Sequence, residues 1–334
     1  MSFETVSIII PCYNEQATIR LLLEAIYKQT YPRSAIEVLI VDGMSTDCTR
    51  EEIAVFQTQY SDLAIQIVDN PMRVIPAGLN RGISTASGQI LIRLDGHAVP
   101  TLEYVERCVN DLNAGLGDNV GGVWEIHPAR SGAIAAGIAT AASHPLGVGD
   151  ALYRHTDRPH AVDTVPFFAF RRELAERVGK YNESLLTNED YEFNVRIRQS
   201  GGTVWLDPAI RSIYYARPTL SALARQYWRY GYWKGRMLLR YPRTLRWRQA
   251  LPPAFVASLI GLIILAIVLP WSRWLLAGEV TVYSLVLLAA GALTAFKQRN
   301  LPLLFSLPLA IVVMHLSWGT GLWWSLIKFM LKKK

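Results

Sequence analysis

The rear of this chain is almost devoid of acidic residues. Residues 201–334 contain 17 Lys and Arg but only two acids, Asp207 and Glu279, whereas residues 1–200 contain 25 Asp and Glu against 17 Lys and Arg. An acidic front joined to a basic, apolar rear favours an enzyme body seated on an anionic membrane surface. The same distribution argues against a nucleic-acid partner.

Cysteine is scarce, and a secretory signal is lacking at the start of the sequence. Cys12, Cys48 and Cys108 are too widely spaced to form a CxxC pair, which indicates a reducing compartment and structural thiols. The predicted strand at residues 6–10 lies almost at the start of the sequence. The basic segment and long apolar core of a signal peptide do not precede it, so we expect no signal peptide. Internal repeats and low-complexity linkers are lacking as well.

The first 120 residues alternate between two kinds of hydrophobic pattern. Strands are predicted at residues 6–10, 38–41, 65–68 and 90–94, and helices at residues 15–28, 46–60, 76–86 and 102–112. This rhythm predicts an α/β fold with a mainly parallel sheet that is covered on both faces. Beyond it we expect strands at 121–124 and 165–170, helices at 131–142 and 189–199, and a loop over the site at 147–164.

Three long apolar runs follow, at residues 254–271, 280–296 and 301–326, each long enough for a membrane helix. Pro302, Pro308, Gly319 and Gly321 interrupt the third run. The basic residues after the second run and at 332–334 both favour the cytoplasm. A third crossing conflicts with this, and a broken re-entrant or interfacial third segment would resolve it. We therefore divide the chain into a catalytic domain at 1–220, a basic aromatic interfacial segment at 221–252 and a membrane tail at 253–334.

Polar clusters stand where the predicted parallel strands end, which is where ligands bind in such sheets. Asp95 and His97 leave one strand end two residues apart and could hold a divalent cation against a diphosphate. Asp42 follows the second strand, before a glycine, and could accept a hydrogen bond from a nucleobase. Tyr13 could pack on the base and Glu15 could bind the ribose or the base edge, although either could equally begin the next helix.

Two further clusters have both structural and chemical interpretations. Asp190 follows Glu189 at a predicted helix start, where it would serve either as a general base or as part of a capping box. Arg229 lies in the basic aromatic segment, where it would clamp a phosphate or anchor the segment at a membrane surface.

Taken together, these segments resemble the family 2 (GT-A) glycosyltransferases, which are inverting nucleotide-sugar transferases. The resemblance is carried by VSIIIPCYNE, IEVLIVDGMSTDCT, LNRGISTASGQILIRLDGH, NED and QYWRYG, and extends to about residue 240. The DGH variant, the HPLGVG stretch, VDTV before FRRE and the apolar tail are similar to the ExoA-like branch of succinoglycan and exopolysaccharide assembly. The resemblance implies a Rossmann-like GT-A domain followed by transmembrane helices.

The family also implies roles for matched positions. Nucleotide-sugar binding falls to Pro11, Tyr13, Glu15, Asp42, Arg73, Asp95 and Gly96, and catalysis to Asp190 with Glu189. Asp95 and His97 would hold Mn²⁺ or Mg²⁺, with His97 departing from the usual Asp-x-Asp. Gln226, Arg229 and Tyr230 match a QxxRW element that faces the acceptor diphosphate, with Tyr230 in place of Trp.

The resemblance implies transfer from a nucleotide sugar, UDP-glucose among the candidates, to a polyprenyl-diphosphate-linked saccharide at the inner (plasma) membrane. The catalytic domain would then be cytoplasmic. Two alternatives stay open at this stage. The chain could transfer the sugar to polyprenyl phosphate itself, where the nucleophile is already ionised and Asp190 is not needed as a base. It could also be a degenerate transferase that serves as a membrane scaffold, although the presence of Asp42, Asp95 and Asp190 speaks against this.

Overall fold

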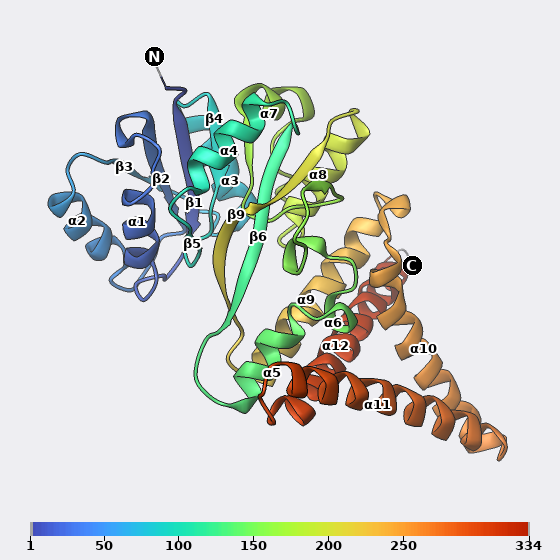
Figure 1. Cartoon of the computed structure of the whole chain (residues 1–334). Coiled ribbons are helices and arrows are strands. Elements are labelled where there is room, and N and C mark those ends of the chain that lie inside the picture. The colour runs from blue at the N-terminus through green and yellow to red at the C-terminus, as the bar shows by residue number, and fades with distance from the viewer. Residues whose placement is uncertain (1–2, 333–334) are drawn as a thin grey trace. The chain divides into compact units, whose positions relative to one another are not determined.

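The computed structural model describes residues 3–332, which fall into two compact units (Figure 1). The first unit comprises the residues up to Glu125 together with Leu152–Tyr214, and the second comprises Ile126–Ala151 together with the residues from Tyr215 onward. The apolar tail therefore forms one unit with a short segment taken from the middle of the chain.

A mixed sheet organises the first unit. Its parallel half consists of β1 (Val6–Cys12), β2 (Ile36–Asp42), β3 (Ala64–Asp69) and β4 (Ile90–Arg93) in the order β3-β2-β1-β4. The order continues through β8 (Ala169–Arg171), β6 (Asn119–Pro128), β9 (Val204–Ala216) and β5 (Val99–Pro100), with β7 (His160–Ala161) beside β9. The pairs β4–β8, β6–β8, β5–β9 and β7–β9 are antiparallel.

Alternating strand side chains build a core on each face of the sheet. On one face Ile8 and Ile40 pack with α1 (Ile19–Tyr27), α2 (Thr49–Gln59) and α4 (Tyr104–Asn113). On the other, Ile9 and Leu39 pack with α3 (Ile75–Thr85), α7 (Arg172–Val178) and α8 (Glu189–Gln199). This double covering is the reason that β1 and β2 read as continuous apolar runs.

Two sequence expectations in this unit were wrong in detail. The helix expected from residue 15 begins at Ile19, because Thr18 before it has φ −126°, which lies outside the helical range. The strand expected at 165–170 is ordered as β8 only from Ala169, because Phe167 has φ 46°, a left-handed conformation that interrupts an extended strand. Strand β9 was not expected at all. The segment 147–164 contains a 3₁₀ turn at Leu152–Arg154 and β7.

The second unit is helical. It contains α5 (Ala133–Ala141), α6 (Pro145–Val148), α9 (Leu220–Leu238), a 3₁₀ turn at Pro242–Thr244, α10 (Trp247–Val268), α11 (Ser272–Lys297) and α12 (Leu303–Lys332). Within residues 3–332, α10, α11 and α12 are long and apolar enough to cross a membrane. Figure 1 shows α10 and α11 converging at their shared loop, and α12 running beside α9 and α5.

No break interrupts the third apolar segment, contrary to one of the two expectations. Pro302 precedes α12, and Pro308 is accommodated inside it. The glycines serve close helix packing, because a Cβ at Gly319 would collide with the Pro252 carbonyl and one at Gly321 with the Trp228 carbonyl. Glycine at such contacts lets two helix backbones approach closely.

Candidate active site

Three neighbouring parallel strands bring the nucleotide-binding candidates together. Residues at the ends of β1 and β2 touch, since a Cβ on Gly43 would lie 3.3 Å from the Tyr13 ring. Residues after β1 and β4 also touch, since a Cβ on Gly96 would lie 3.0 Å from Glu15 Cγ. Tyr13 is exposed, and Pro11 is half-buried inside β1. The expected cluster at the carboxyl edge of the sheet is therefore present.

Asp42 is more enclosed than its place at a strand end suggested. Its side chain is fully buried, and its carboxylate accepts hydrogen bonds from the Ser45 hydroxyl at 2.5 Å and from Arg50 Nε at 2.6 Å. Arg50 also bonds to Asp69 at the end of β3. The direct contact of Asp42 with a nucleobase stays a prediction, because the chain itself supplies donors to this carboxylate.

His97 lies against a carboxylate. Its Nδ1 is 3.2 Å from Glu15 Oε1, and Glu15 Oε2 accepts a 2.6 Å hydrogen bond from Thr18 Oγ1. Metal-binding histidines usually have such a carboxylate on the ring nitrogen that does not face the metal. Glu15 was predicted to bind the ribose or the base edge. Its contact with His97 adds a second role for Glu15, which is to orient the His97 ring.

An arginine that the sequence analysis did not select connects the strand end to the acidic helix start. Arg93, the last residue of β4, has a side chain only 8% exposed. Its Nη2 lies 2.9 Å from Glu189 Oε1, and its Nε and Nη2 each lie 3.2 Å from Asp95 Oδ1. A single guanidinium thus joins the predicted cation ligand to the predicted catalytic pair. The signal was available in the sequence as one charge inside an otherwise apolar strand.

The two acids at the start of α8 have different surroundings. Burial, with the Asp190 carboxylate beside it, raises the pKa of Glu189 to about 7, and the Arg93 charge opposes that rise. Burial also raises the pKa of Asp190 above its ordinary value, again against Arg93. Glu189 is buried in its ion pair, whereas Asp190 is half-buried and accepts a 2.7 Å hydrogen bond from the Tyr191 N–H. Asp190 is therefore the member of the pair with room to meet a substrate.

The capping interpretation of this segment was wrong. Asn188 occupies the N-cap position of α8 in a left-handed conformation, and its side chain makes no capping hydrogen bond. The segment before it is held by Asn80 on α3, whose side chain bonds to the Tyr181 backbone N–H at 2.8 Å and C=O at 2.9 Å, and to Glu183 at 2.8 Å. Asn80 is a second contributor that the sequence analysis did not single out.

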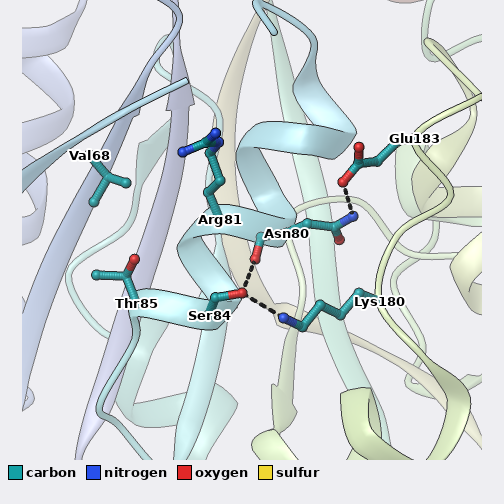
Figure 2. Close-up of a pocket in the computed structure, with 7 residues that line it drawn as sticks. All are labelled: Val68, Asn80, Arg81, Ser84, Thr85, Lys180 and Glu183. Atoms are coloured by element: carbon teal, nitrogen blue, oxygen red, sulfur yellow. Dashed lines mark hydrogen bonds between the residues drawn. The ribbon is translucent and has the colours of Figure 1, made fainter. Parts of the chain in front are cut away.

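A surface pocket lies beside the hydrogen bonds that Asn80 makes. Its cavity volume is 440 Å³, and Figure 2 shows Lys180 reaching Ser84 while Asn80 reaches Glu183. The lining residues are Val68, Asn80, Arg81, Ser84, Thr85, Lys180 and Glu183. None of the predicted site residues lines this pocket, so we assign the chemistry to the strand-end cluster instead.

The remaining candidates lie apart from that cluster in the chain. Arg73 follows β3, is exposed and has φ 54°. Gln226, Arg229 and Tyr230 lie on α9 in the second unit, where Gln226 Nε2 donates a 2.9 Å hydrogen bond to the Tyr230 hydroxyl. The i, i+4 spacing of that pair places both on one side of the helix. Their roles in acceptor binding stay predictions.

A family model and two sequence relatives match this chain. The model described as "Glycosyl transferase family 2" matches residues 7–179. The succinoglycan biosynthesis protein ExoA of Rhizobium meliloti is 33% identical over 324 residues, which cover 96% of this chain and 95% of that protein. A dolichyl N-acetyl-alpha-D-glucosaminyl phosphate 3-beta-D-2,3-diacetamido-2,3-dideoxy-beta-D-glucuronosyltransferase of Methanococcus voltae is 27% identical over 333 residues, 97% of each chain.

The fold also has a solved counterpart. The mannosyltransferase PcManGT from Pyrobaculum calidifontis, whose structure is described as a complex with GDP-Man and Mn²⁺, superimposes with a TM-score of 0.60. The match covers 95% of this chain and 87% of that one at 22% sequence identity. This likeness shows that the chain shares its fold with that protein over nearly its whole length.

Proposed function

This chain belongs to glycosyl transferase family 2, and from that premise we propose that it transfers one sugar, with inversion, from a nucleotide sugar to a lipid-linked saccharide. We further propose UDP-glucose as the donor and a polyprenyl-diphosphate-linked saccharide in polysaccharide assembly as the acceptor. The full-length similarity to ExoA supports a role in polysaccharide assembly. The dolichyl-phosphate-linked sugar in the name of the Methanococcus relative supports an acceptor carried on a polyprenyl lipid.

The observation on which this proposal rests is the connection of Asp190 to the strand-end cluster through Glu189, Arg93 and Asp95. Asp190 would remove the proton from an acceptor hydroxyl, whose oxygen then forms a bond to the anomeric carbon. The bond to the diphosphate breaks on the opposite side, so an α-linked donor gives a β-linked product. Glu189 is held by Arg93 and keeps the first turn of α8 in place for this step.

The donor set at Asp95 and His97 fits a divalent cation that arrives with its substrate. Among residues 3–332 no group of three or more His, Cys, Asp or Glu is placed to hold a metal ion. Asp95 and His97 are 22% and 35% exposed, so both side chains are accessible. Magnesium and similar ions often take one or two protein ligands and complete their shell with phosphate oxygens. Such an ion would neutralise charge on the leaving diphosphate.

The membrane tail supplies the setting for a lipid acceptor. Residues 211–250 contain ten Arg or Lys and no acid, and they directly precede α10. Basic residues near a surface of anionic lipid each add about 1 kcal/mol of attraction. Arg229 lies on α9 in this stretch and would bind the acceptor diphosphate. We therefore place the protein at the inner membrane with its catalytic unit in the cytoplasm.

The packing of the tail favours two crossings over three. Helices α10 and α11 are largely uncovered by the rest of the protein. In their most apolar stretches 11% and 17% is buried, against 44% in that of α12. The second half of α12 packs on α9, where Gly231 faces Trp318 and Gly235 faces Ser325. Because α9 contains four Lys and Arg, it belongs outside the hydrocarbon layer, and α12 would stay beside it. A reporter fused after residue 334 should then respond as cytoplasmic, and a periplasmic response would contradict this arrangement.

A screen of donors against acceptors tests the function. Membranes containing the full chain would be incubated with labelled UDP-glucose, other UDP-sugars or GDP-mannose, and with either polyprenyl phosphate or polyprenyl-diphosphate saccharides. The proposal predicts label in the lipid-linked saccharide alone. Label in polyprenyl phosphate would favour a monosaccharide synthase instead, and hydrolysis or binding without transfer to either lipid would contradict the proposed activity.

A further inference from the structure

Arg93 occupies a costly position for a charged side chain. It ends β4, a central strand whose four residues are all buried between the two helical layers. A buried guanidinium is tolerated when carboxylates surround it, and Arg93 has Asp95 on one side and Glu189 on the other. Within residues 3–332 its Nη1 makes no hydrogen bond of ordinary geometry, although the buried Tyr181 hydroxyl, which likewise makes none, lies close enough for the Arg93 charge to act on the pKa of Tyr181. An arginine that served only to stabilise the fold would be expected to have all of its donors satisfied.

The two carboxylates that share Arg93 differ in access. Glu189 is 6% exposed, so its partner in any state of the site is the guanidinium. Asp95 is more accessible and holds Arg93 through two contacts of 3.2 Å, which are longer than the 2.9 Å contact to Glu189. Asp95 is thus the partner that a second cation can reach and share.

We propose that Arg93 is a positioning residue that stands in for the divalent cation until the nucleotide sugar arrives. The inference rests on the proposed function, in which Asp95 is a ligand of that cation. In the unloaded site the guanidinium neutralises Asp95 and keeps it beside the acidic start of α8. When the cation and diphosphate bind, Asp95 turns its charge to the cation, and Arg93 stays with Glu189 and keeps Asp190 in place.

This role gives Arg93 two effects of opposite sign. Its charge competes with the cation for Asp95, so its removal should tighten cation binding. Its hold on Glu189 orders the first turn of α8, so its removal should slow transfer. If Arg93 served only to link β4 to α8, its removal would disorder the site and weaken both cation binding and transfer.

The same helix offers a matched control. Arg196 pairs with the buried Glu192 one turn further along α8, at 3.0 Å, and donates to backbone carbonyls of the segment before α8. This Arg–Glu pair also lies within the first unit, with Glu192 1% and Arg196 19% exposed. Arg196→Gln therefore reports the cost of losing an α8 ion pair as such.

The test measures Mn²⁺ binding and transfer separately on the full-length protein in detergent. Free Mn²⁺ would be followed by its paramagnetic resonance signal, with and without UDP as the diphosphate probe. We expect Arg93→Gln to bind Mn²⁺ about tenfold more tightly, from the loss of one nearby positive charge, and to transfer sugar about 100-fold more slowly or worse. Arg93→Lys keeps the charge and should stay within about twofold of the original Mn²⁺ affinity. Arg196→Gln should leave Mn²⁺ affinity unchanged.

Weaker Mn²⁺ binding in Arg93→Gln would overturn the proposal, as would an unchanged affinity in both arginine variants. If Arg93→Gln does not fold, a shift in Mn²⁺ affinity in Arg93→Lys as large as that expected for the glutamine variant would overturn it. Failure of the unsubstituted protein to bind Mn²⁺ in the presence of UDP would remove the proposed cation role, and the stand-in role with it. Tight Mn²⁺ binding without transfer by the unsubstituted protein would overturn the proposed function while leaving the role of Arg93 at the cation site intact.

Discussion

Replacement of Asp190 by asparagine separates catalysis from folding at this site. The Asn side-chain oxygen can still accept the hydrogen bond from the Tyr191 N–H, so the first turn of α8 should be preserved. The substitution removes the only acid of the pair that is half-exposed. Loss of a general base typically lowers the rate by about 10²- to 10⁴-fold. We expect a loss of at least this size, with nucleotide binding retained.

The same substitution should make the protein more stable. Glu189 has a pKa raised to about 7, partly because Asp190 is charged beside it, so above pH 7 the folded state contains two neighbouring carboxylates. Removing one relieves the cost of burying its charge and its repulsion of the other; these outweigh the lost attraction to Arg93, because the pKa of Asp190 is raised on balance, and the net gain is about 1 to 3 kcal/mol at an effective dielectric of about 20. For a domain of this size that corresponds to a rise in Tm of roughly 2 to 10 °C.

The assay pairs thermal unfolding at pH 8 with turnover of labelled donor. Opposite changes, with Tm raised and transfer lost, are the expected result, because a purely structural carboxylate would lower both when removed. Asp47→Asn is a useful control, since Asp47 bonds to Thr49 near the start of α2 and is not among the catalytic candidates. Near-normal turnover in folded Asp190→Asn would refute the assignment of the base.

Three further outcomes follow from the same geometry. Transfer should require a divalent cation, with His97→Ala lowering activity far more than Tm and His97→Asp shifting preference from Mn²⁺ towards Mg²⁺; full activity in excess chelator would refute this. Because burial raises the pKa of Asp190, the base becomes protonated at a higher pH than an ordinary aspartate does, so kcat/KM should begin to decline well above the ordinary Asp pKa of about 3.9 as the pH is lowered; a flat profile down to about pH 4.5 would contradict the raised pKa. Gly231→Leu should disrupt the contact of α9 with α12 and lower Tm and transfer to lipid acceptors, whereas Gly261→Leu, where a Cβ meets nothing within 4 Å, should leave both unchanged.

The parallel half of the sheet could be predicted because its signals are local. Each strand there is an apolar run followed by a helix, and the rule that ligands bind at the carboxyl ends then placed Asp42, Asp95 and His97 near one another. The boundaries of β2 and α8 were correct to within two residues, and those of α8 were correct at both ends. The family resemblance is confirmed by the match of its model to residues 7–179.

The antiparallel half and the ion pairs depend on contacts that local patterns do not encode. Strand β8 is short because of the backbone conformation at Phe167, and β9 pairs with β5 and β7, which lie far from it in the chain. The link from Arg93 to Glu189 joins residues 96 positions apart. In the third apolar segment, glycine was interpreted as a possible break, yet Gly321 serves the close approach of two helices, which only the partner helix reveals.

The configuration of the new glycosidic bond tests the central claim most directly. The product formed by the full-length protein from an α-linked UDP-sugar and a lipid-linked saccharide would be released and its anomeric proton coupling measured by NMR. A single in-line displacement with Asp190 as the base predicts a β-linkage, and no linkage at all from Asp190→Asn. A product with retained α-configuration would contradict the account.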